Sequence, residues 1–249
     1  MQSREPTNQS TSDLTYFAAM RDFFEGDEAD VIEQIDGFPK YASRQSLAKF
    51  LTKYEIFKRI LHVNGSIVEC GVLHGAGLLA WAKLSSILEP VNHTRKVIGF
   101  DTFSGFPNVT PEDTGPGAST HLVAGGLTGS TLDNVAEAVA IYDMNRPLGH
   151  IPKVELVKGD ITETAPEYLK KNQHLVVSLL YLDLDLYAPT KAAIKAFLPR
   201  MPMGAIVCFD ELNARSFPGE TAAVNEALGL DNLRIQRFPF DPYVSFAVL

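Results

Sequence analysis

Short apolar runs alternate with amphipathic segments along most of this chain of 249 residues. Five runs rich in Val, Ile and Leu have the length of strands buried on both faces of a parallel sheet: 66–71, 96–100, 153–158, 175–182 and 204–209. Segments with helical spacing follow them at 78–88, 132–142, 165–171, 189–198 and 218–228. Residues 233–238 and 243–249 can pair as a closing hairpin. The pattern predicts an α/β fold, a three-layer sandwich around a mostly parallel sheet of six or seven strands.

Two further helices are predicted before the first strand, over residues 12–24 and 43–63. They either cover the sheet or a subunit interface, or form a lid over a site. Residues 1–12 are polar without an apolar period, and we expect them to be mobile. No linker divides the remainder, so we expect one domain over 13–249, with N-terminal helices over 13–63 and the α/β core over 64–249.

Composition narrows the class of protein. The net charge of -8, without a cluster of Lys and Arg, argues against nucleic acid or an anionic membrane as the main partner. No apolar stretch has the roughly 20 residues of a membrane span, and the N-terminus lacks the apolar core of a signal peptide. Cys70 and Cys208 each lie in a strand-like run and are expected to be reduced core residues. A cytoplasmic compartment fits this pattern.

Carboxylates follow two of the predicted strands directly. The run ending at Leu182 continues into Asp183-Leu184-Asp185, and the run ending at residue 209 continues into Asp210-Glu211. If these strands are parallel neighbours, about 4.8 Å apart, Asp183, Asp210 and Glu211 come close together. Two charges about 4 Å apart repel by roughly 4 kcal/mol at an effective dielectric constant of about 20. Such oxygen ligands predict a hard divalent metal, Mg²⁺ first, with Mn²⁺ or Ca²⁺ as alternatives.

A glycine-rich turn follows the first predicted strand. Its spacing, Glu-x-Gly-x-x-x-Gly-x-Gly from Glu69 to Gly77, differs from the dinucleotide fingerprint and places a carboxylate before the first glycine. The turn either binds a ligand with a cationic group or only allows tight packing. Asp101 ends the second strand, where an acid can bind the hydroxyls of a ribose, or can simply cap a turn.

A long connection rich in glycine and proline covers residues 102–130. A connection of this length in a compact domain is more often a functional lid than filler. His121, near its middle, either reaches a substrate or is an exposed loop residue without a role.

Four motifs in the same order resemble the macrocin O-methyltransferase family. They are Val-Glu-Cys-Gly-Val-Leu-His-Gly-Ala-Gly at 68–77, Gly-Phe-Asp-Thr-Phe-Ser-Gly-Phe-Pro at 99–107, Leu-Asp-Leu-Asp-Leu-Tyr-Ala-Pro-Thr at 182–190, and Phe-Asp-Glu followed by Phe-Pro-Gly. The resemblance runs from about residue 40 to residue 228. It implies a class I, Rossmann-like methyltransferase fold, with S-adenosyl-L-methionine and Mg²⁺ as cofactors. It also implies methylation of a sugar hydroxyl, or of a related phenol, in natural-product biosynthesis.

The resemblance also assigns roles by position. It gives Glu69, Gly71 and Gly75 to the methionine end and loop of the cofactor, Asp101 and Thr102 to its ribose, and Asp160 and Ile161 to the border of its adenine. It gives Asp183, Asp210 and Glu211 to the metal. Asp185 falls on the position proposed as general base; if the strand persists beyond Asp183, both side chains project to the same side. The family commonly has Asp-Asp where this chain has Asp210-Glu211, which makes Glu211 the least secure ligand.

The implied acceptor is the 3-hydroxyl of a nucleotide-linked 6-deoxyhexose such as dTDP-L-rhamnose, or else a phenolic or glycosylated acceptor. A nucleotide diphosphate would need basic partners, for which Arg44, Lys49 and Arg215 are candidates. The metal would hold the acceptor hydroxyl, with Asp183 as ligand and Asp185 as proton acceptor. The resemblance also implies a homo-oligomer, a dimer or larger.

Two other classes compete with this interpretation. Asp183-Leu184-Asp185 is also the DxD motif with which many glycosyltransferases hold a metal on a nucleotide sugar. Alternatively, the chain is a nucleotide-binding or structural α/β domain in which the acids only cap helices. The glycine-rich turn with Glu69 argues against the first, and acids at both strand ends argue against the second.

Overall fold

The structure, a computed structural model, describes residues 10–249, with residues 13 and 14 lacking a side-chain description. Most of the segment expected to be mobile, residues 1–12, lies outside the described residues. The chain divides into two compact units, Met1–Lys49 and Phe50–Leu249, and the boundary falls inside helix α3 (Arg44–Ile60). One domain over 13–249 therefore stays a prediction. No helix among the described residues is long and apolar enough to cross a membrane.

The described part of the first unit is helical. It contains α1 (Thr11–Glu25), α2 (Val31–Asp36) and the single-turn 3-10 helix η2 (Phe38–Lys40) before α3 begins. The first helix was predicted, whereas α2 was not. Asp30 accepts a hydrogen bond from the backbone of Ile32 at 2.9 Å, and Glu33 accepts one from the backbone of Asp30 at 3.0 Å. This reciprocal capping box starts α2 although the helix is too short to show an apolar period.

The second unit is built on a seven-stranded sheet in the order β3-β2-β1-β4-β5-β7-β6. Its strands are β1 (Ser66–Cys70), β2 (Val97–Asp101), β3 (Val154–Lys158), β4 (Val177–Leu182), β5 (Ile206–Phe209), β6 (Gln236–Arg237) and β7 (Ser245–Val248). The first five are parallel, and β7 pairs antiparallel with both β5 and β6. The predicted parallel strands and closing hairpin are thus present.

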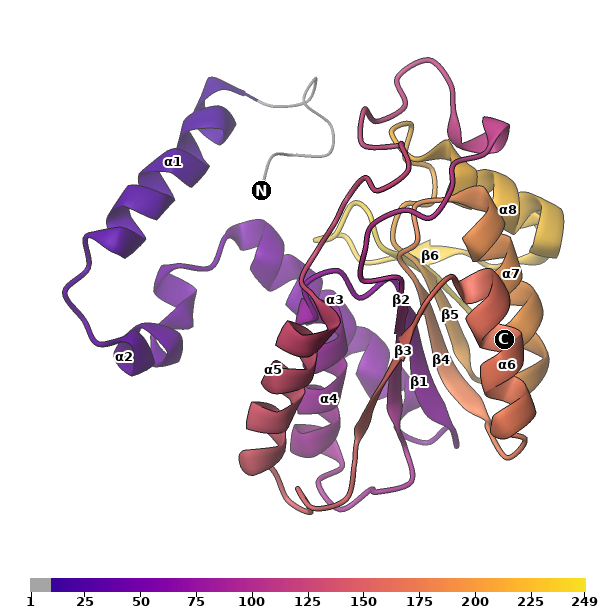
Figure 1. The fold of residues 1–249 in the computed structure, drawn as a ribbon, viewed down its shortest axis with the longest axis horizontal. Helices are drawn as coiled ribbons and strands as arrows, with labels where there is room; N and C mark the ends of the chain where they lie inside the picture. Colours follow the sequence, from indigo (N-terminus) through magenta and orange to yellow (C-terminus); the bar gives the residue numbers. More distant parts are fainter. Residues whose placement is uncertain (1–9) are drawn as a thin grey trace. The chain divides into compact units, whose positions relative to one another are not determined.

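Helices cover both faces of the sheet, as Figure 1 shows. On one face α4 (Ala76–Leu88), α5 (Leu132–Met144) and the second half of α3 pack on alternate strand residues such as Ile67 and Leu179. On the other face α6 (Ile161–Lys171), α7 (Tyr187–Phe197) and α8 (Pro218–Leu228) pack on the intervening residues, such as Val68 and Leu180. This alternation confirms the predicted three-layer α/β sandwich.

Two of the boundaries that differ from the prediction do so for local reasons. Helix α6 begins at Ile161 rather than at residue 165, because Asp160 caps it by accepting the Thr162 backbone N–H at 2.9 Å. Strand β4 begins at Val177 rather than at residue 175, because a turn in which the Leu175 backbone donates to Asn172 precedes it. Both differences reflect backbone hydrogen bonds that the apolar pattern does not encode.

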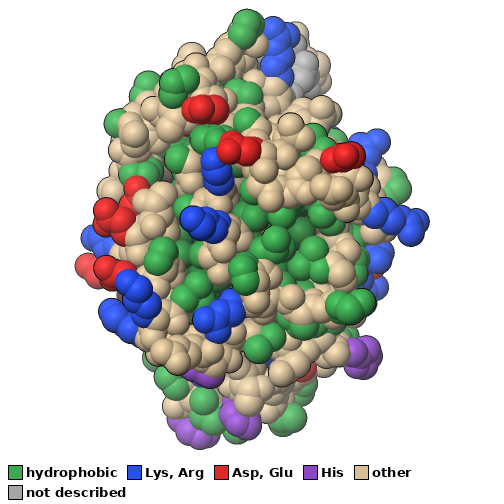
Figure 2. Space-filling model, turned by 90° about the vertical axis from the view of Figure 1, so that its right-hand side faces the viewer, with side chains coloured by type: hydrophobic (Ala, Val, Ile, Leu, Met, Phe, Trp, Pro, Cys, Tyr) green, Lys and Arg blue, Asp and Glu red, His purple; other side chains and the backbone are tan. Residues whose placement is uncertain are grey.

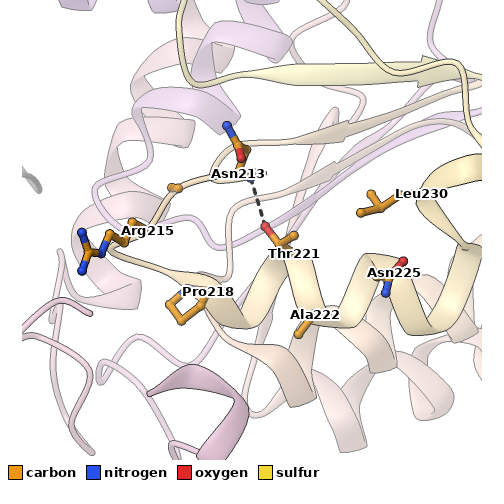
Figure 3. A pocket seen from close by; sticks show the side chains of 8 residues that line it. Asn213, Arg215, Pro218, Thr221, Ala222, Asn225 and Leu230 are labelled. Carbon is orange, nitrogen blue, oxygen red and sulfur yellow. Dashed lines mark hydrogen bonds between the residues drawn. The ribbon is translucent and has the colours of Figure 1, made fainter. Parts of the chain in front are cut away.

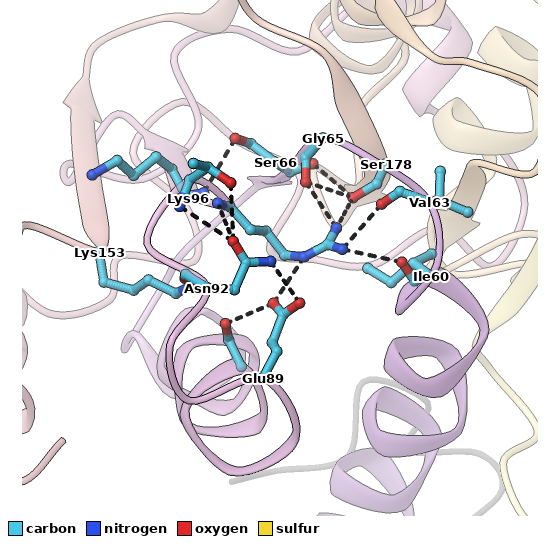
Figure 4. Close-up of polar contacts among 12 residues, drawn as sticks. Ile60, Val63, Gly65, Ser66, Glu89, Asn92, Lys96, Lys153 and Ser178 are labelled. Carbon is cyan, nitrogen blue, oxygen red and sulfur yellow. Dashed lines mark hydrogen bonds and ion pairs between the residues drawn. The ribbon is translucent and has the colours of Figure 1, made fainter. Parts of the chain in front are cut away.

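A buried arginine ties together the amino ends of the strands. Arg95, 4% exposed, donates from Nε to Glu89 at 2.8 Å and from Nη1 to the Ser178 hydroxyl at 2.5 Å. Its terminal nitrogens also donate to three carbonyl oxygens, those of Gly65 (2.8 Å), Val63 (3.0 Å) and Ile60 (3.1 Å). Figure 4 shows these partners, Glu89, Ser178, Gly65, Val63 and Ile60, gathered in one place. One side chain therefore links the connections that precede β1 and β2 to the start of β4.

Histidines also favour this edge. Four of the six lie in connections that lead into parallel strands: His62, His93, His150 and His174. Figure 2 shows histidine side chains gathered at the lower end of the molecule, whereas Lys, Arg, Asp and Glu are interspersed over the rest of that face. Only His74 and His121 lie in connections that follow parallel strands. An imidazole at the opposite edge of the sheet must therefore come from one of these two.

Replacing Arg95 by methionine should lower the free energy of unfolding by about 3–5 kcal/mol, because the buried Glu89 carboxylate would lose its cationic partner and three carbonyl oxygens would each lose a donor. Urea denaturation followed by circular dichroism measures this. Lys83→Met, at an exposed position of α4, is the control and should change stability by less than about 0.5 kcal/mol. Equal stability of the two variants would contradict a stabilising role for Arg95.

Candidate active site

The glycine-rich turn between β1 and α4 is shaped by contacts within the chain. Gly71 has a φ of +94°, and a Cβ there would lie 1.8 Å from the carbonyl oxygen of Asp183. A Cβ on Gly77 would lie 2.1 Å from Oε1 of Glu69. Gly75 precedes α4 as its N-cap with a φ of +79°. The glycines are therefore required by packing, and they bring the turn against the acids that end β1 and β4.

Asp101, at the end of β2, fastens this turn. Its Oδ2 accepts the backbone N–H groups of Val72 and Leu73 at 2.7 and 2.9 Å, and its Oδ1 accepts that of Phe103 at 2.7 Å. Thr102 closes the following turn by donating to the Gly105 carbonyl at 2.6 Å. The alternative of a turn-capping Asp101 thus has direct support, and binding of a ribose stays a prediction for both residues.

Glu69 is buried beside the turn. It is 2% exposed, and its Oε2 has no hydrogen-bond partner among the described residues. Burial raises the pKa of Glu69 to about 8; the ammonium of Lys53 opposes this rise, and the charges of Asp183 and Asp210 add to it. An orphaned, buried carboxylate oxygen fits a ligand that carries a cationic group.

The acids after β4 do not continue the strand. Asp183 donates its backbone N–H to the Cys70 carbonyl at 2.8 Å, but β4 ends at Leu182, so the condition that the strand persists beyond Asp183 is not met. Asp185 instead has a φ of +62° in the turn before α7 and is only 4% exposed. A non-glycine residue in this backbone region marks a constrained turn, of the kind found at functional sites.

Asp210 and Glu211 leave β5 beside them. Strands β4 and β5 are parallel neighbours, as expected, and the Asp210 backbone donates to the Leu182 carbonyl at 3.0 Å. Asp210 is fully buried and accepts a hydrogen bond from the Tyr181 hydroxyl at 2.5 Å. Glu211 is 2% exposed, and its backbone N–H donates to Oε1 of Glu220 at 2.9 Å.

Glu220, on the first turn of α8, adds another carboxylate. It is fully buried, and its pKa lies well above the usual range because of burial and the charges of Asp210, Glu211 and Asp185. The charge of Asp210 thus raises the pKa of two other acids, Glu69 and Glu220. The structure brings the predicted acids to one edge of the sheet and adds an acid that sequence reasoning missed.

The donor chemistry of this edge fits a hard cation, but no ligand set is assembled. Within residues 10–249, no three His, Cys, Asp or Glu side chains form a group that could hold a metal ion. The available donors are carboxylate oxygens in buried positions, which is the chemistry that Mg²⁺ or Ca²⁺ selects. A bound ion would have to draw these side chains closer together.

The residues predicted at the adenine border have structural partners. Asp160 caps α6, and its Oδ1 accepts from both the backbone and the hydroxyl of Thr162, at 2.9 and 2.8 Å. Ile161 is 4% exposed and its side chain packs in the core under α6. Any contact of Ile161 with a ligand would therefore involve its backbone.

The long connection, residues 102–130, is attached to both halves of this edge. Asp113, in the 3-10 helix η3 (Pro111–Asp113), is fully buried and accepts the backbone N–H of Tyr187, the first residue of α7, at 2.6 Å. The Ser119 backbone donates to the Ser216 carbonyl at 2.9 Å, and the Ser130 backbone donates to that of Leu73 at 3.0 Å. The connection therefore runs from the glycine-rich turn to the starts of α7 and α8.

Two histidines lie in this region. His121 is exposed, and its backbone N–H donates to the hydroxyl of Ser119 at 3.2 Å. His74 is also exposed, and its Nδ1 lies 3.0 Å from the Ser130 hydroxyl. Neither imidazole is buried among the acids, so the acid–base groups of this edge are carboxyl groups.

A cavity of about 470 Å³ opens beside α8. Its lining comes from the connection after β5, from α8 and from the 3-10 helix η5 (Leu230–Asn232): Asn213, Ala214, Arg215, Pro218, Thr221, Ala222, Asn225 and Leu230. Figure 3 shows the Thr221 hydroxyl facing the Asn213 backbone, which donates to it at 3.0 Å. Arg215 is held to the long connection by a 2.8 Å hydrogen bond from its Nε to the Pro116 carbonyl. The first of these lining residues, Asn213, lies two positions after Glu211 in the sequence.

The sequence matches the macrocin-O-methyltransferase (TylF) family over residues 50–227. This chain belongs to that family. The family confirms the predicted O-methyltransferase activity, and it replaces the glycosyltransferase and non-enzyme alternatives. None of the curated protein sequences compared with the chain matches it.

Solved structures agree with this assignment. The enzyme is 31% identical to CalS11, a calicheamicin methyltransferase, with a TM-score of 0.91 over 97% of this chain and 94% of CalS11. The apo structure of CalS11, described as a TDP-rhamnose 3'-O-methyltransferase of calicheamicin biosynthesis, gives 30% identity and a TM-score of 0.83, covering 97% and 96%. The O-methyltransferase NovP, at 19% identity and a TM-score of 0.64 over 81% and 79%, shares the fold.

Among the buried charged residues that sequence reasoning missed in this methyltransferase are Lys53, Asp113 and Glu220. Lys53 lies on the apolar stripe of α3 with Ile56, Phe57 and Ile60, so a lysine inside a buried stripe was its signal. Glu220 directly follows the Phe-Pro-Gly motif, on the first turn of α8. Asp113 gave no signal of its link to α7, because Tyr187, whose backbone it binds, is distant in the chain.

The pH dependence of stability should report the buried carboxyl of Glu69. Because its pKa is raised, to about 8, the folded state holds a proton that the unfolded state loses near pH 4.5. The free energy of unfolding should therefore fall between about pH 5 and 8, by at most about 1.4 kcal/mol per pH unit, relative to that of Glu69→Gln. Urea denaturation of both proteins across this range measures the difference.

Asp231→Asn, at an exposed position, should follow the wild-type curve over the same pH range. Parallel curves for the wild type and Glu69→Gln would contradict the raised pKa of Glu69.

Proposed function

We propose that this enzyme transfers the methyl group of S-adenosyl-L-methionine to a sugar hydroxyl, with a divalent metal, in natural-product biosynthesis. The proposed acceptor is the 3-hydroxyl of a nucleotide-linked 6-deoxyhexose such as dTDP-L-rhamnose. The observation that carries this proposal is the 30% identity, over 97% of the chain, to an enzyme described as a TDP-rhamnose 3'-O-methyltransferase. A phenolic or glycosylated acceptor is the alternative within the same class.

The proposed cofactor site follows the carboxyl ends of β1, β2 and β3. Glu69, with its buried Oε2 lacking a partner, would meet the ammonium group of the methionine moiety, and the turn with Gly71 and Gly75 would border it. Asp101 with Thr102, and Asp160 with Ile161, lie at the ends of the next strands and would border the ribose and the adenine. The cofactor, when bound, supplies an electrophilic methyl group on a sulfonium.

The proposed metal ligands are Asp183, Asp210 and Glu211, with Mg²⁺ as the first candidate and Mn²⁺ or Ca²⁺ as alternatives. Support comes from their position at neighbouring strand ends and from the burial of Asp210 and Glu211. A divalent ion there would offset their charge, orient an acceptor hydroxyl and lower its pKa. Tyr181, which donates to Asp210, would fix the orientation of this carboxylate.

Asp185 is the proposed general base. Its constrained turn fixes the backbone, and its burial removes competing water, so one orientation of the carboxylate would be available to take a proton from the acceptor. Since the reacting oxygen, methyl carbon and sulfur must lie nearly in line, positioning should supply much of the acceleration.

The cavity beside α8 is the proposed acceptor pocket. It lies close to Glu211 in the sequence, and within its mostly apolar lining Asn213, Arg215 and Thr221 supply polar groups for a sugar with an anionic substituent. The guanidinium of Arg215 would meet a diphosphate, as Arg does in many phosphate sites. At long range the net charge of -8 would repel such an anion, so recognition would depend on this local contact.

Self-association into a homo-oligomer is part of the proposal. The described part of the first unit exposes several large apolar side chains, which suit a contact with another surface: Tyr16, Phe17, Phe23, Phe24, Val31, Ile32, Ile35 and Phe38.

The deciding experiment combines two measurements. Isothermal titration with S-adenosylhomocysteine should show binding, and dTDP-L-rhamnose should be methylated in the presence of Mg²⁺ but not after treatment with EDTA. Asp210→Asn should keep its affinity for S-adenosylhomocysteine within about threefold of the wild type and lose transfer. Binding without transfer would reject this acceptor, and transfer at the wild-type rate in metal-free buffer would reject the metal.

Asp185→Asn should slow the chemical step by about 100-fold or more, because the amide accepts no proton while the turn keeps its shape. Single-turnover transfer, measured by rapid quench at saturating acceptor, gives this rate. Asp231→Asn is the matched exposed control and should behave as the wild type. An unchanged single-turnover rate for Asp185→Asn would remove Asp185 as the base.

A further inference from the structure

Lys53 is a buried cation on the side of the site that faces α3. Among the described residues three basic side chains are buried, namely Lys53, Arg95 and Lys153, at 7%, 4% and 4% exposure. Arg95 and Lys153 belong to the amino edge of the sheet, where Lys153 donates to the Asn92 carbonyl at 2.6 Å. Lys53 is therefore the buried cation available to the acids at the carboxyl edge.

Two aromatic rings enclose its ammonium group. Nζ lies 3.7 Å from the ring centre of Tyr181 and 5.0 Å from that of Trp81. The two rings pack edge to face, with their centres 5.7 Å apart. Attraction of a cation to ring faces is strongest where water is excluded, as it is here. These contacts fix the position of the charge and leave it little freedom to move.

The ammonium group of Lys53 lies near the acids at the carboxyl edge of the sheet. Glu69 is aligned with Tyr181, and Tyr181 with Cys208, on neighbouring strands, so their side chains point to the face covered by α3 and α4. Lys53 is the largest influence that favours the ionised form of Glu69 against burial. The ring on which Lys53 rests also carries the hydroxyl that donates to Asp210 at 2.5 Å.

We propose that Lys53 is a positioning residue for methyl transfer, which holds the Glu69 side chain in place for the cofactor and keeps the Tyr181 hydroxyl directed at Asp210. Lys53 acts through these two side chains and touches no reacting atom. The inference rests on the proposed role of Glu69 in binding the cofactor.

The test is Lys53→Met, which keeps the length and apolar contacts of the side chain but removes its charge. The matched control is Lys58→Met, since Lys58 lies on the same helix, also rests over a ring, that of Tyr54 at 4.6 Å, and is 39% exposed. Isothermal titration with S-adenosylhomocysteine, thermal melting and steady-state transfer are measured for each protein. Lys53→Arg restores the charge.

The expected result is a dissociation constant for S-adenosylhomocysteine at least tenfold higher in Lys53→Met, with a matching rise in KM for the methyl donor. Lys58→Met should stay within twofold of the wild type, and Lys53→Arg should recover most of the affinity. A cation that serves packing alone would change the melting temperature and leave the dissociation constant unchanged, and that result overturns the inference. If Lys53→Met does not fold, Lys53→Gln is measured in its place, against the same limits.

Failure of the underlying function gives a different result. A wild-type enzyme that does not bind S-adenosylhomocysteine overturns the proposed cofactor site, and with it the role of Lys53. Binding by the wild type with equal affinity in Lys53→Met overturns only the role of Lys53.

Discussion

Concentration of negative charge at the carboxyl edge of the sheet is the constraint on which the rest of this structure depends. Parallel strands must deliver whatever follows them to one edge, and here β1, β4 and β5 each end in or lead into acids. Glu69, Asp185, Asp210 and Glu211 are all nearly inaccessible to water, so their charges interact strongly. Such an arrangement is tolerable only if protons, an ammonium group or bound cations share the edge.

The two edges of the sheet differ in how far their buried polar groups are satisfied. At the amino edge, Arg95 satisfies carbonyl oxygens and the Glu89 carboxylate in a closed network, so this edge is complete without a ligand. At the carboxyl edge, Glu69 and Glu220 each retain a buried oxygen that has no hydrogen-bond partner among residues 10–249. The amino edge therefore contributes to stability, and the carboxyl edge keeps polar groups for a ligand, as expected for an enzyme of this fold.

The sequence predicted the parts that depend on regular repetition. Buried strands, the helices between them and the delivery of acids by β4 and β5 follow from apolar period and from parallel pairing. The left-handed backbone at Asp185 was not predictable, since it is uncommon for residues other than glycine and the apolar period does not encode it. Lys53 and Glu220 were missed because a charge is identified as buried only once its neighbours are known. Helix α2 was missed because it is too short to show an apolar period, and its capping box starts it nonetheless.

Asp113 links two parts of the site that are distant in the sequence. Its carboxylate accepts the first backbone N–H of α7, and this helix starts two residues after Asp185. A movement that withdraws the long connection therefore also releases the end of the turn that orients Asp185. Opening of the connection to admit a substrate would then also disturb the orientation of Asp185, the proposed base. The enzyme would be able to remove a proton only when the connection is closed.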